Sequence, residues 1–166
     1  YLPSPGIVKL RLTCKGKERL VAEKIINDKI EKLKLLIPEY IYGYDEDELN
    51  TIVGKLLQNE NATMATAESC TGGKVAHLIT SISGSSAYFK GAIIAYANEV
   101  KIDQLGVSHS ALEKYGAVSE EVVSEMVKGV VQKMNVDYAI ATSGIAGPTG
   151  GTEEKPVGTV WVAVAD

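Results

Sequence analysis

Four short apolar runs, separated by helical patterns, constrain the fold of this chain more than any other feature. The runs cover residues 63–67, 91–97, 138–142 and 158–165. They are nearly continuous rather than alternating, as expected for strands whose two faces are both covered by helices. The sequence therefore predicts an α/β fold, a three-layer α/β/α sandwich around a mostly parallel or mixed sheet.

The segments between these runs carry helix signals. Ser119 is suited to an N-cap, and Glu120 and Glu121 suit the positive first turn of a helix that runs to Met134. An acidic stretch at residues 45–48 similarly precedes a helical pattern of leucine, isoleucine and valine. The other expected helices cover residues 71–80, 98–105 and 110–115.

The first 44 residues form a separate small unit in this prediction. Residues 7–14 alternate apolar and charged side chains, which is typical of a strand with one buried face. Residues 17–36 show helical spacing, and residues 40–42 are expected to form a second strand. This strand-helix-strand unit has too little core to be stable alone. The larger domain is expected to cover residues 45–166.

Cysteine usage and apolar run lengths exclude several classes of protein. Cys14 and Cys70 are too few for a disulfide scaffold, and neither has a zinc-ligand spacing with His77 or His109. We therefore expect free thiols and no metal. No run approaches the roughly 20 apolar residues of a membrane span, and no basic-then-apolar leader opens the chain. The expectation is a soluble cytoplasmic protein with no membrane partner.

The charge is unevenly distributed. The chain has a net charge of -4, yet residues 1–39 hold nine Lys and Arg against five Asp and Glu. That basic stretch could contact RNA, or it could be a solvated helix face. We favour the solvated face because no aromatic residues are interleaved with the charges. The acidic remainder argues against a nucleic-acid partner.

Three polar, glycine-containing segments follow or precede the apolar runs, where open α/β sheets gather ligands. They are residues 68–73, 83–86 and 143–151. The first leads from a strand into a helix, so its free N–H groups would suit an anion such as phosphate, although small residues there also permit close packing. It is neither a Walker loop nor a dinucleotide fingerprint. The third is typical of a functional loop, with a plain connector as the alternative.

Several separate motifs carry a specific family resemblance. They are AESCTGG at 67–73, GSS at 84–86, Tyr96 with Asn98, Glu99 and Lys101, GV at 106–107, GAVS at 116–119, SGIAGP at 143–148 and EKPVGTVW at 154–161. Together they closely resemble the C-terminal domain of the CinA family. Residues 2–11 resemble the small middle domain of long CinA proteins. The resemblance also implies a further strand, a Gly/Arg-containing segment and a terminal helix beyond Asp166, so we expect a truncated domain.

The resemblance implies an enzyme, a nicotinamide-nucleotide amidase that converts nicotinamide mononucleotide to nicotinic acid mononucleotide and ammonia. No cofactor is implied, and a homodimer or higher homo-oligomer is expected. The family's catalytic Ser, Tyr and Lys fall by motif on Ser86, Tyr96 and Lys101. The expected substrate-binding residues are Ser69, Thr71, Gly72, Gly73, Gly84, Ser85, Ser143, Gly144 and Gly147. The alternative is a non-catalytic dimerisation or regulatory module of a competence or DNA-damage response.

A lysine base suits this sequence because no histidine is next to a candidate serine. Such a base must be partly neutral, so its pKa has to fall from about 10.4. If Asn98 caps the following helix, Lys101 lies in the first turn, where the helix dipole disfavours an ammonium. Tyr96 could relay the proton or hold the leaving amine. Cys70 is the rival nucleophile, since a thiol at a helix N-terminus gains thiolate character, whereas a buried cysteine would be inert.

Overall fold

The computed structural model describes residues 2–4, 6–16 and 18–166, with side chains described from Gly6 onward. It contains two compact units, Tyr1–Asp45 and Glu46–Asp166, here called unit 1 and unit 2. The sequence prediction places the boundary one residue earlier, between residues 44 and 45.

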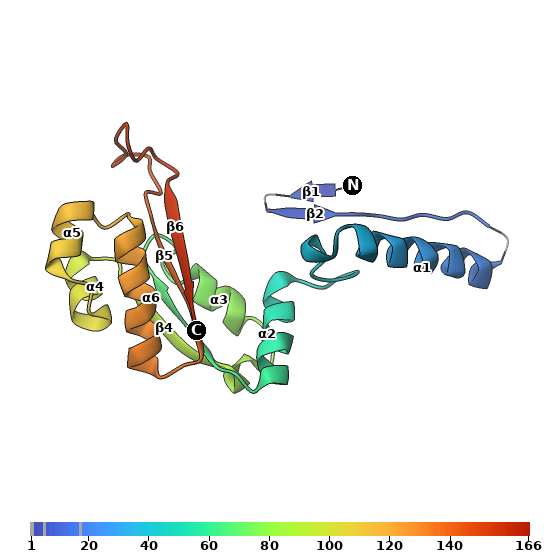
Figure 1. Cartoon of the computed structure of the whole chain (residues 1–166), viewed down its shortest axis with the longest axis horizontal. Coiled ribbons are helices and arrows are strands. Elements are labelled where there is room, and N and C mark those ends of the chain that lie inside the picture. The colour runs from blue at the N-terminus through green and yellow to red at the C-terminus, as the bar shows by residue number, and fades with distance from the viewer. Residues whose placement is uncertain (1, 5, 17) are drawn as a thin grey trace. The chain divides into compact units, whose positions relative to one another are not determined.

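Unit 1 consists of a short hairpin and one long helix (Figure 1). Its elements are β1 (Leu2–Ser4), β2 (Ile7–Lys9), α1 (Arg19–Leu36) and the 3₁₀ turn η1 (Pro38–Tyr40). The predicted strand over residues 7–14 is limited to β2, because only the three residues of β1 pair with it. The strand predicted at residues 40–42 is wrong, since Pro38 starts a 3₁₀ turn there. The predicted helix start at residue 17 lies outside the described residues.

Unit 2 alternates helices and strands along the chain (Figure 1). Its elements are α2 (Leu49–Glu60), β3 (Met64–Glu68), α3 (Lys74–Thr80), η2 (Ser85–Ala87), β4 (Phe89–Ile94), α4 (Asn98–Leu105), α5 (His109–Tyr115), α6 (Glu120–Met134), β5 (Tyr138–Gly144) and β6 (Val160–Ala165). Every helix and strand predicted for this region is present, with ends that differ by up to three residues. Ser119 is the N-cap of α6, as predicted, and its Oγ accepts from the Val122 N–H at 3.3 Å.

The sheet of unit 2 has four strands in the order β4-β3-β5-β6. β3 is parallel to both β4 and β5, and β6 is antiparallel to β5. α6, with α4 and α5 beside it, covers one face of the sheet, and α2 and α3 lie on the other (Figure 1). The predicted three-layer α/β/α sandwich with a mixed sheet is therefore confirmed.

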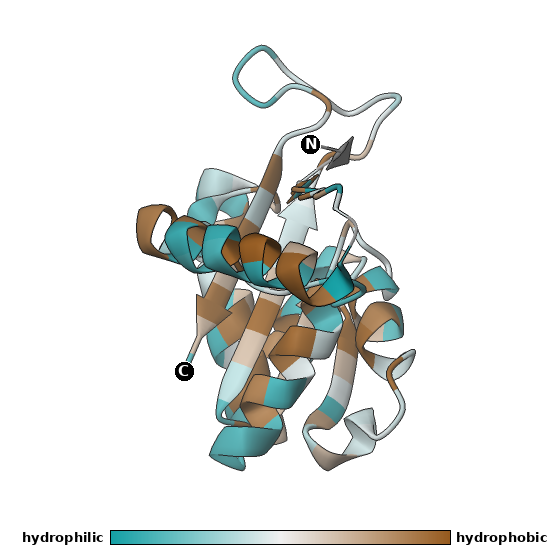
Figure 2. Ribbon diagram, turned by 90° about the vertical axis from the view of Figure 1, so that its right-hand side faces the viewer, coloured by the Kyte–Doolittle hydropathy of each residue, from teal (hydrophilic) through white to brown (hydrophobic). Residues whose placement is uncertain are grey.

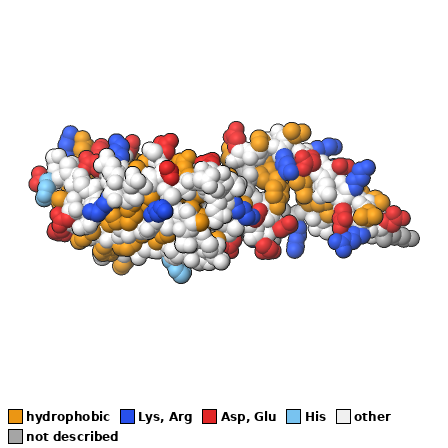
Figure 3. All heavy atoms as spheres, turned by 90° about the horizontal axis from the view of Figure 1, so that it is seen from below, with side chains coloured by type: hydrophobic (Ala, Val, Ile, Leu, Met, Phe, Trp, Pro, Cys, Tyr) orange, Lys and Arg blue, Asp and Glu red, His pale blue; other side chains and the backbone are white. Residues whose placement is uncertain are grey.

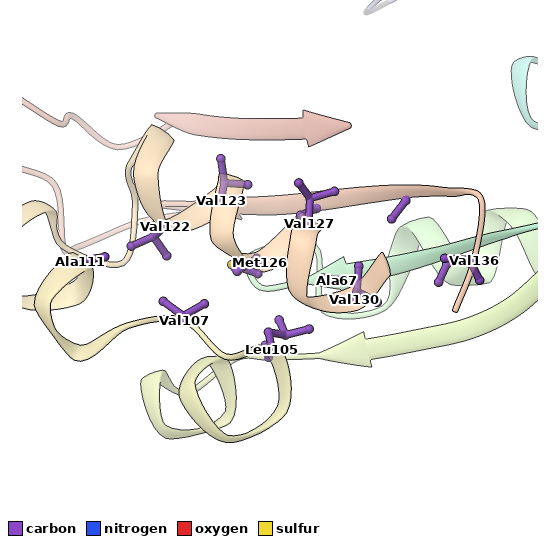
Figure 4. Close-up of a cluster of buried hydrophobic side chains, with 14 residues drawn as sticks. Ala67, Leu105, Val107, Ala111, Val122, Val123, Met126, Val127, Val130 and Val136 are labelled. Atoms are coloured by element: carbon purple, nitrogen blue, oxygen red, sulfur yellow. The ribbon is translucent and has the colours of Figure 1, made fainter. Parts of the chain in front are cut away.

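The main core lies between α6 and the sheet (Figure 4). α6 contributes its most buried side chains, Val122, Val123, Met126, Val127 and Val130. The facing strand residues are small, namely Ala65, Ala67, Ala139 and Ala141. Alanines on the strands let the bulky valines of the helix fill the space between the two layers without overpacking.

β6 departs from the expectation that every strand is covered on both faces. Ala163 and Ala165 pack against the α6 core, but Val160, Val162 and Val164 are 54%, 59% and 69% exposed. Figure 2 shows mostly hydrophobic colours on this strand toward the C-terminal end. The apolar residues packed under α2 and α3 come from β3, β4 and β5, so these two helices do not extend over β6.

The surface carries mixed charges. On the face drawn in Figure 3, Lys and Arg side chains lie among Asp and Glu rather than in a patch of one sign. None of the helices in the described ranges is both long enough and apolar enough to cross a membrane.

Candidate active site

The parallel strands bring three polar segments to one edge of the sheet. β3, β4 and β5 run in the same direction, so the residues that follow them lie side by side at what we call the carboxyl edge. Glu68 ends β3, Ala95 follows β4, and Gly144 ends β5. The opposite end of the same strands, where Met64 and Tyr138 begin β3 and β5, is the amino edge.

Lys101 is a buried amine at the carboxyl edge. Lys101 is 1% exposed, and its Nζ donates to the carbonyl oxygens of Ala95 at 2.8 Å and Tyr96 at 3.1 Å. Burial lowers the pKa of Lys101, although negative charge on the nearby Cys70 and Glu99 would act in the opposite direction. A neutral amine has two N–H groups, so these two hydrogen bonds leave its lone pair free to accept a proton.

α4 holds Lys101 in place. The N-cap is Ala97, which makes no side-chain cap, so the expectation that Asn98 caps this helix is wrong. Asn98 is instead the first helical residue, and Lys101 still lies in the first turn, where the helix dipole disfavours an ammonium. At the other end of the helix, Leu105 is 3% exposed and packs into the α6 core, which fixes the position of α4.

Glu68 is a residue that the sequence analysis did not single out. It is fully buried, and its carboxylate accepts five hydrogen bonds, from Thr71 Oγ1 at 2.6 Å, Ala76 N at 2.7 Å, Gly73 N at 3.0 Å, Val75 N at 3.0 Å and Thr66 Oγ1 at 3.3 Å. Burial alone would raise the pKa of Glu68, but the hydrogen bonds from Thr71 and the α3 backbone outweigh it and hold the pKa below its usual value.

The start of α3 does not offer the free N–H groups that would suit a phosphate, one of the two interpretations of residues 68–73. The N–H groups of Gly73, Val75 and Ala76 are not free, because all three donate to Glu68. A carboxylate of the chain itself satisfies the positive end of this helix. No periodic pattern could have revealed this, since the donors lie five, seven and eight residues after the acceptor.

The surroundings of Cys70 disfavour its thiolate form. Burial raises the pKa of Cys70, and the negative charge of Glu68 adds to the effect, while Lys101 and a hydrogen bond with Thr142 oppose it. The net shift is therefore opposite to the lowering expected from a helix N-terminus, because burial outweighs the backbone hydrogen bond that lowers the pKa of Cys70. Cys70 Sγ also lies against Gly144, where an added Cβ would come within 3.0 Å of the sulfur.

The predicted site residues fall into two groups at opposite edges of the sheet. The carboxyl edge and its loops hold Ser69, Thr71, Gly72, Gly73, Tyr96, Lys101, Ser143, Gly144 and Gly147. The amino edge holds Gly84, Ser85 and Ser86, in and next to the η2 turn just before β4. The Tyr88 carbonyl beside them accepts from Met64 N at 2.7 Å, which fixes η2 to the start of β3.

Ser86 and Lys101 of one chain are therefore not brought together. β4 lies between them and has six residues, which span roughly 20 Å in an extended strand. The catalytic assignment of Ser86, Tyr96 and Lys101 stays a prediction. Tyr96 is 75% exposed, so its ring is free to meet a ligand at the carboxyl edge.

The loop between β5 and β6 leaves from the carboxyl edge and is anchored at two places. At its base, Ile145 N donates to Thr159 O at 2.9 Å and Gly158 N donates to Ile145 O at 2.8 Å. Farther out, Lys155 Nζ donates to the Tyr115 carbonyl at 2.6 Å, at the C-terminal end of α5. The Ser143 hydroxyl is also hydrogen-bonded within the chain, because its Oγ donates to Ala117 O at 2.7 Å.

No metal centre is apparent in the part of the chain that the structure describes: it contains no group of three or more His, Cys, Asp or Glu side chains that could hold an ion. A hollow of about 330 Å³ lies in unit 1, next to Cys14, Val21 and Ile25. The residues that line it belong to unit 1.

The fold and the site define an α/β sandwich domain with a buried lysine at the carboxyl edge of its sheet. The chain belongs to the CinA family, because residues 46–166 match the family model of the CinA C-terminal domain. It is 53% identical to a CinA-like protein of Cytophaga hutchinsonii over 168 residues, which covers 100% of this chain and 40% of that protein. A CinA-like protein of Flavobacterium psychrophilum is 48% identical over 99% of this chain and 40% of its own length. The chain thus spans about 40% of the curated relatives it matches.

Solved structures show the same fold. A competence/damage inducible protein from Agrobacterium tumefaciens matches with a TM-score of 0.70 and 39% identity, over 75% of each chain. A competence-damaged protein (CinA) superfamily protein from Escherichia coli matches with a TM-score of 0.68 and 33% identity, over 75% of this chain and 74% of its own.

Proposed function

We propose that unit 2 is an amidohydrolase that releases ammonia from nicotinamide mononucleotide, the activity that the CinA resemblance implies. The observation that supports it best is the state of Lys101. An amine that is 1% exposed, held by two carbonyls and lowered in pKa can act as a general base at lower pH than a solvated lysine. Such a base allows a serine to attack an amide without a histidine.

Ser69 is the hydroxyl that we propose Lys101 activates within one chain. Ala95 is hydrogen-bonded both to the residue before Ser69 and to Lys101. Its N–H donates to Glu68 O at 2.8 Å, and its carbonyl accepts from Lys101 Nζ. Side chains alternate along a strand, and Glu68 faces α3 while Ala67 faces α6. Ser69 follows the end of β3 and is 8% exposed, and the next residue, Cys70, is close enough to Lys101 for their charges to interact, which supports a position of Ser69 near Lys101.

The proposed reaction needs only groups of the carboxyl edge. Lys101 takes the proton of Ser69 Oγ, the oxygen attacks the carboxamide carbon, and the amide nitrogen leaves as ammonia with a proton returned from Lys101. Water then hydrolyses the acyl-serine ester to the acid. The exposed ring of Tyr96 is available to contact the substrate or its leaving amine.

The decisive experiment measures ammonia release from nicotinamide mononucleotide by the chain and its variants. Lys101→Met and Ser69→Ala should each lower kcat by about a thousandfold or more, as loss of a member of a catalytic unit does. Lys128→Met, at an exposed lysine of α6, is the matched control and should retain activity. Cys70→Ala should keep most of the activity, because the surroundings of Cys70 disfavour its thiolate form.

Two outcomes would contradict the proposal. If Lys101→Met turns over at the wild-type rate, Lys101 is not the base. If the full-length protein releases no ammonia, the non-catalytic module is the better account.

Ser86 is tested separately, because it would meet Lys101 only from a second copy of the chain. If Ser86→Ala is active, Ser86 is not the nucleophile. If Ser86→Ala and Lys101→Met are each inactive but regain activity when mixed, the site is assembled between two chains, as the predicted homodimer would allow. Sedimentation of the wild-type chain at micromolar concentration tests that self-association directly.

A further inference from the structure

Glu68 is a buried carboxylate without a cation. The ion pairs of the described residues involve other side chains, so Glu68 is stabilised only by its five hydrogen-bond donors. A buried charge needs such compensation, because leaving it unpaired would be costly. An uncharged residue would have been the simpler choice for a purely structural position between a strand and a helix.

The five donors belong to a single stretch of chain. Oε2 accepts from Thr71 Oγ1, Gly73 N and Val75 N, and Oε1 accepts from Ala76 N and Thr66 Oγ1. Both oxygens thus hold the turn that contains Ser69 and Cys70 against the first turn of α3. Thr71 Oγ1 also lies 2.8 Å from Thr142 Oγ1, which ties the same turn to β5.

We infer that Glu68 is the positioning residue of the carboxyl edge: its carboxylate shapes residues 69–73 so that Ser69 and Cys70 keep their places at that edge, with Cys70 near Lys101. It also fills the position at the start of α3 where a substrate anion would otherwise bind, so the substrate phosphate is bound elsewhere. The effect on turnover rests on the proposed function, whereas the effect on Cys70 does not.

The alkylation rate of Cys70 provides a readout that would not change if Glu68 had only a structural role. The charged groups that act on its thiol are Glu68, which raises its pKa, and Lys101, which lowers it, in addition to burial. Removing the Glu68 charge should therefore lower the pKa of Cys70 and speed its alkylation at a fixed pH. The other cysteine, Cys14, is replaced by serine in all variants so that only Cys70 reacts.

The experiment compares Glu68→Gln and Glu68→Asp by the pH profile of Cys70 alkylation with iodoacetamide, and by kcat and KM for ammonia release. Glu68→Gln should shift the alkylation profile to lower pH, with a several-fold faster reaction at pH 8, and should lower kcat far more than it changes KM. Glu68→Asp keeps the charge but shortens the side chain. Its alkylation profile should stay near the wild-type profile while kcat still falls.

The result that would overturn the inference is a folded Glu68→Gln variant with an unchanged alkylation profile and unchanged kcat. If Glu68→Gln does not fold, as judged by circular dichroism, Thr71→Val removes the 2.6 Å bond and keeps the carboxylate. A fall in its kcat with an alkylation profile near that of the wild type supports the inference, because the Glu68 charge is kept, and a wild-type kcat refutes it. If Glu68→Gln shifts the Cys70 alkylation profile but the wild-type protein releases no ammonia, the role of Glu68 is supported and the proposed reaction is rejected.

Discussion

Gly129→Ala should destabilise unit 2 although alanine is the better helix former. Gly129 lies inside α6, and a Cβ added there would be 1.9 Å from the Leu105 carbonyl oxygen of α4, where ordinary contact begins near 3.4 Å. The two helices would have to separate by about 1.5 Å along this contact, the difference between those distances. Both partners are backbone, so no side chain can rotate out of the way.

The magnitude follows from two opposing effects. Replacing glycine in a helix interior gains about 1 kcal/mol, and overpacking a rigid contact costs about 3 kcal/mol or more. The net loss of about 2 kcal/mol should lower Tm by roughly 6–10 °C for a domain of this size. The only tryptophan of the chain, Trp161, lies in β6, so its fluorescence follows the unfolding of unit 2.

Lys128→Ala, at the adjacent exposed position of α6, is the matched control and should stay within about 0.5 kcal/mol of wild type. Because α4 carries Lys101 in its first turn, Gly129→Ala should also reduce ammonia release. A Tm equal to or above that of the wild type would show that α4 and α6 do not approach as closely as described, and would refute the reasoning.

Three further predictions concern a cap and two titrations. Ser119→Ala removes the side-chain cap of α6 and should cost about 1 kcal/mol in urea unfolding, whereas an unchanged midpoint would argue against the cap. The kcat/KM for nicotinamide mononucleotide should rise with pH to a midpoint below 10.5, since burial lowers the pKa of Lys101 and the active form is neutral; a rise centred at 10.5 or above would contradict this. The folded pKa of Glu68 is lowered from 4.5, so its contribution to stability is present above pH 4.5 and is lost as the pH falls through the folded pKa. Glu68→Gln should accordingly flatten the acid limb of the stability profile, and an acid limb as steep as that of the wild type would exclude Glu68 as a cause.

The sequence predicts the elements of unit 2 well where a local signal and the tertiary structure agree. β3 is buried at all five positions, so its apolar run reflects burial on both faces. β6 has the same kind of sequence, yet one face is open, because coverage depends on where α2 and α3 lie and not on the strand itself. Residues 7–14 show a clear strand pattern, but a strand also needs a partner of matching length, and β1 offers three residues.

The candidate site is predictable only in part. The first-turn position of Lys101 follows from local sequence, whereas its burial depends on the packing of α4 against α6. The opposite placement of Ser86 and Lys101 could have been inferred, since a strand of at least six residues separates them and a straight strand keeps its two ends apart. The Glu68 network could not, because it depends on the path of the turn into α3.

The surroundings of Glu68 and Lys101, both buried at the carboxyl edge, lower the pKa of each group for different reasons. Glu68 meets five donors, and hydrogen bonds to a carboxylate favour its charged form. Lys101 donates to two carbonyls, and burial lowers its pKa against the opposing charges of Cys70 and Glu99, which shifts it toward the neutral form compared with a solvated lysine. An ion pair between the two would stabilise the ammonium and remove the base. The alternation of β3 prevents such a pair, because it turns Glu68 toward α3 while Lys101 comes from α4 on the other face of the sheet. The proposed role of Lys101 as a base therefore depends on the same strand geometry that gives Glu68 its place in the turn.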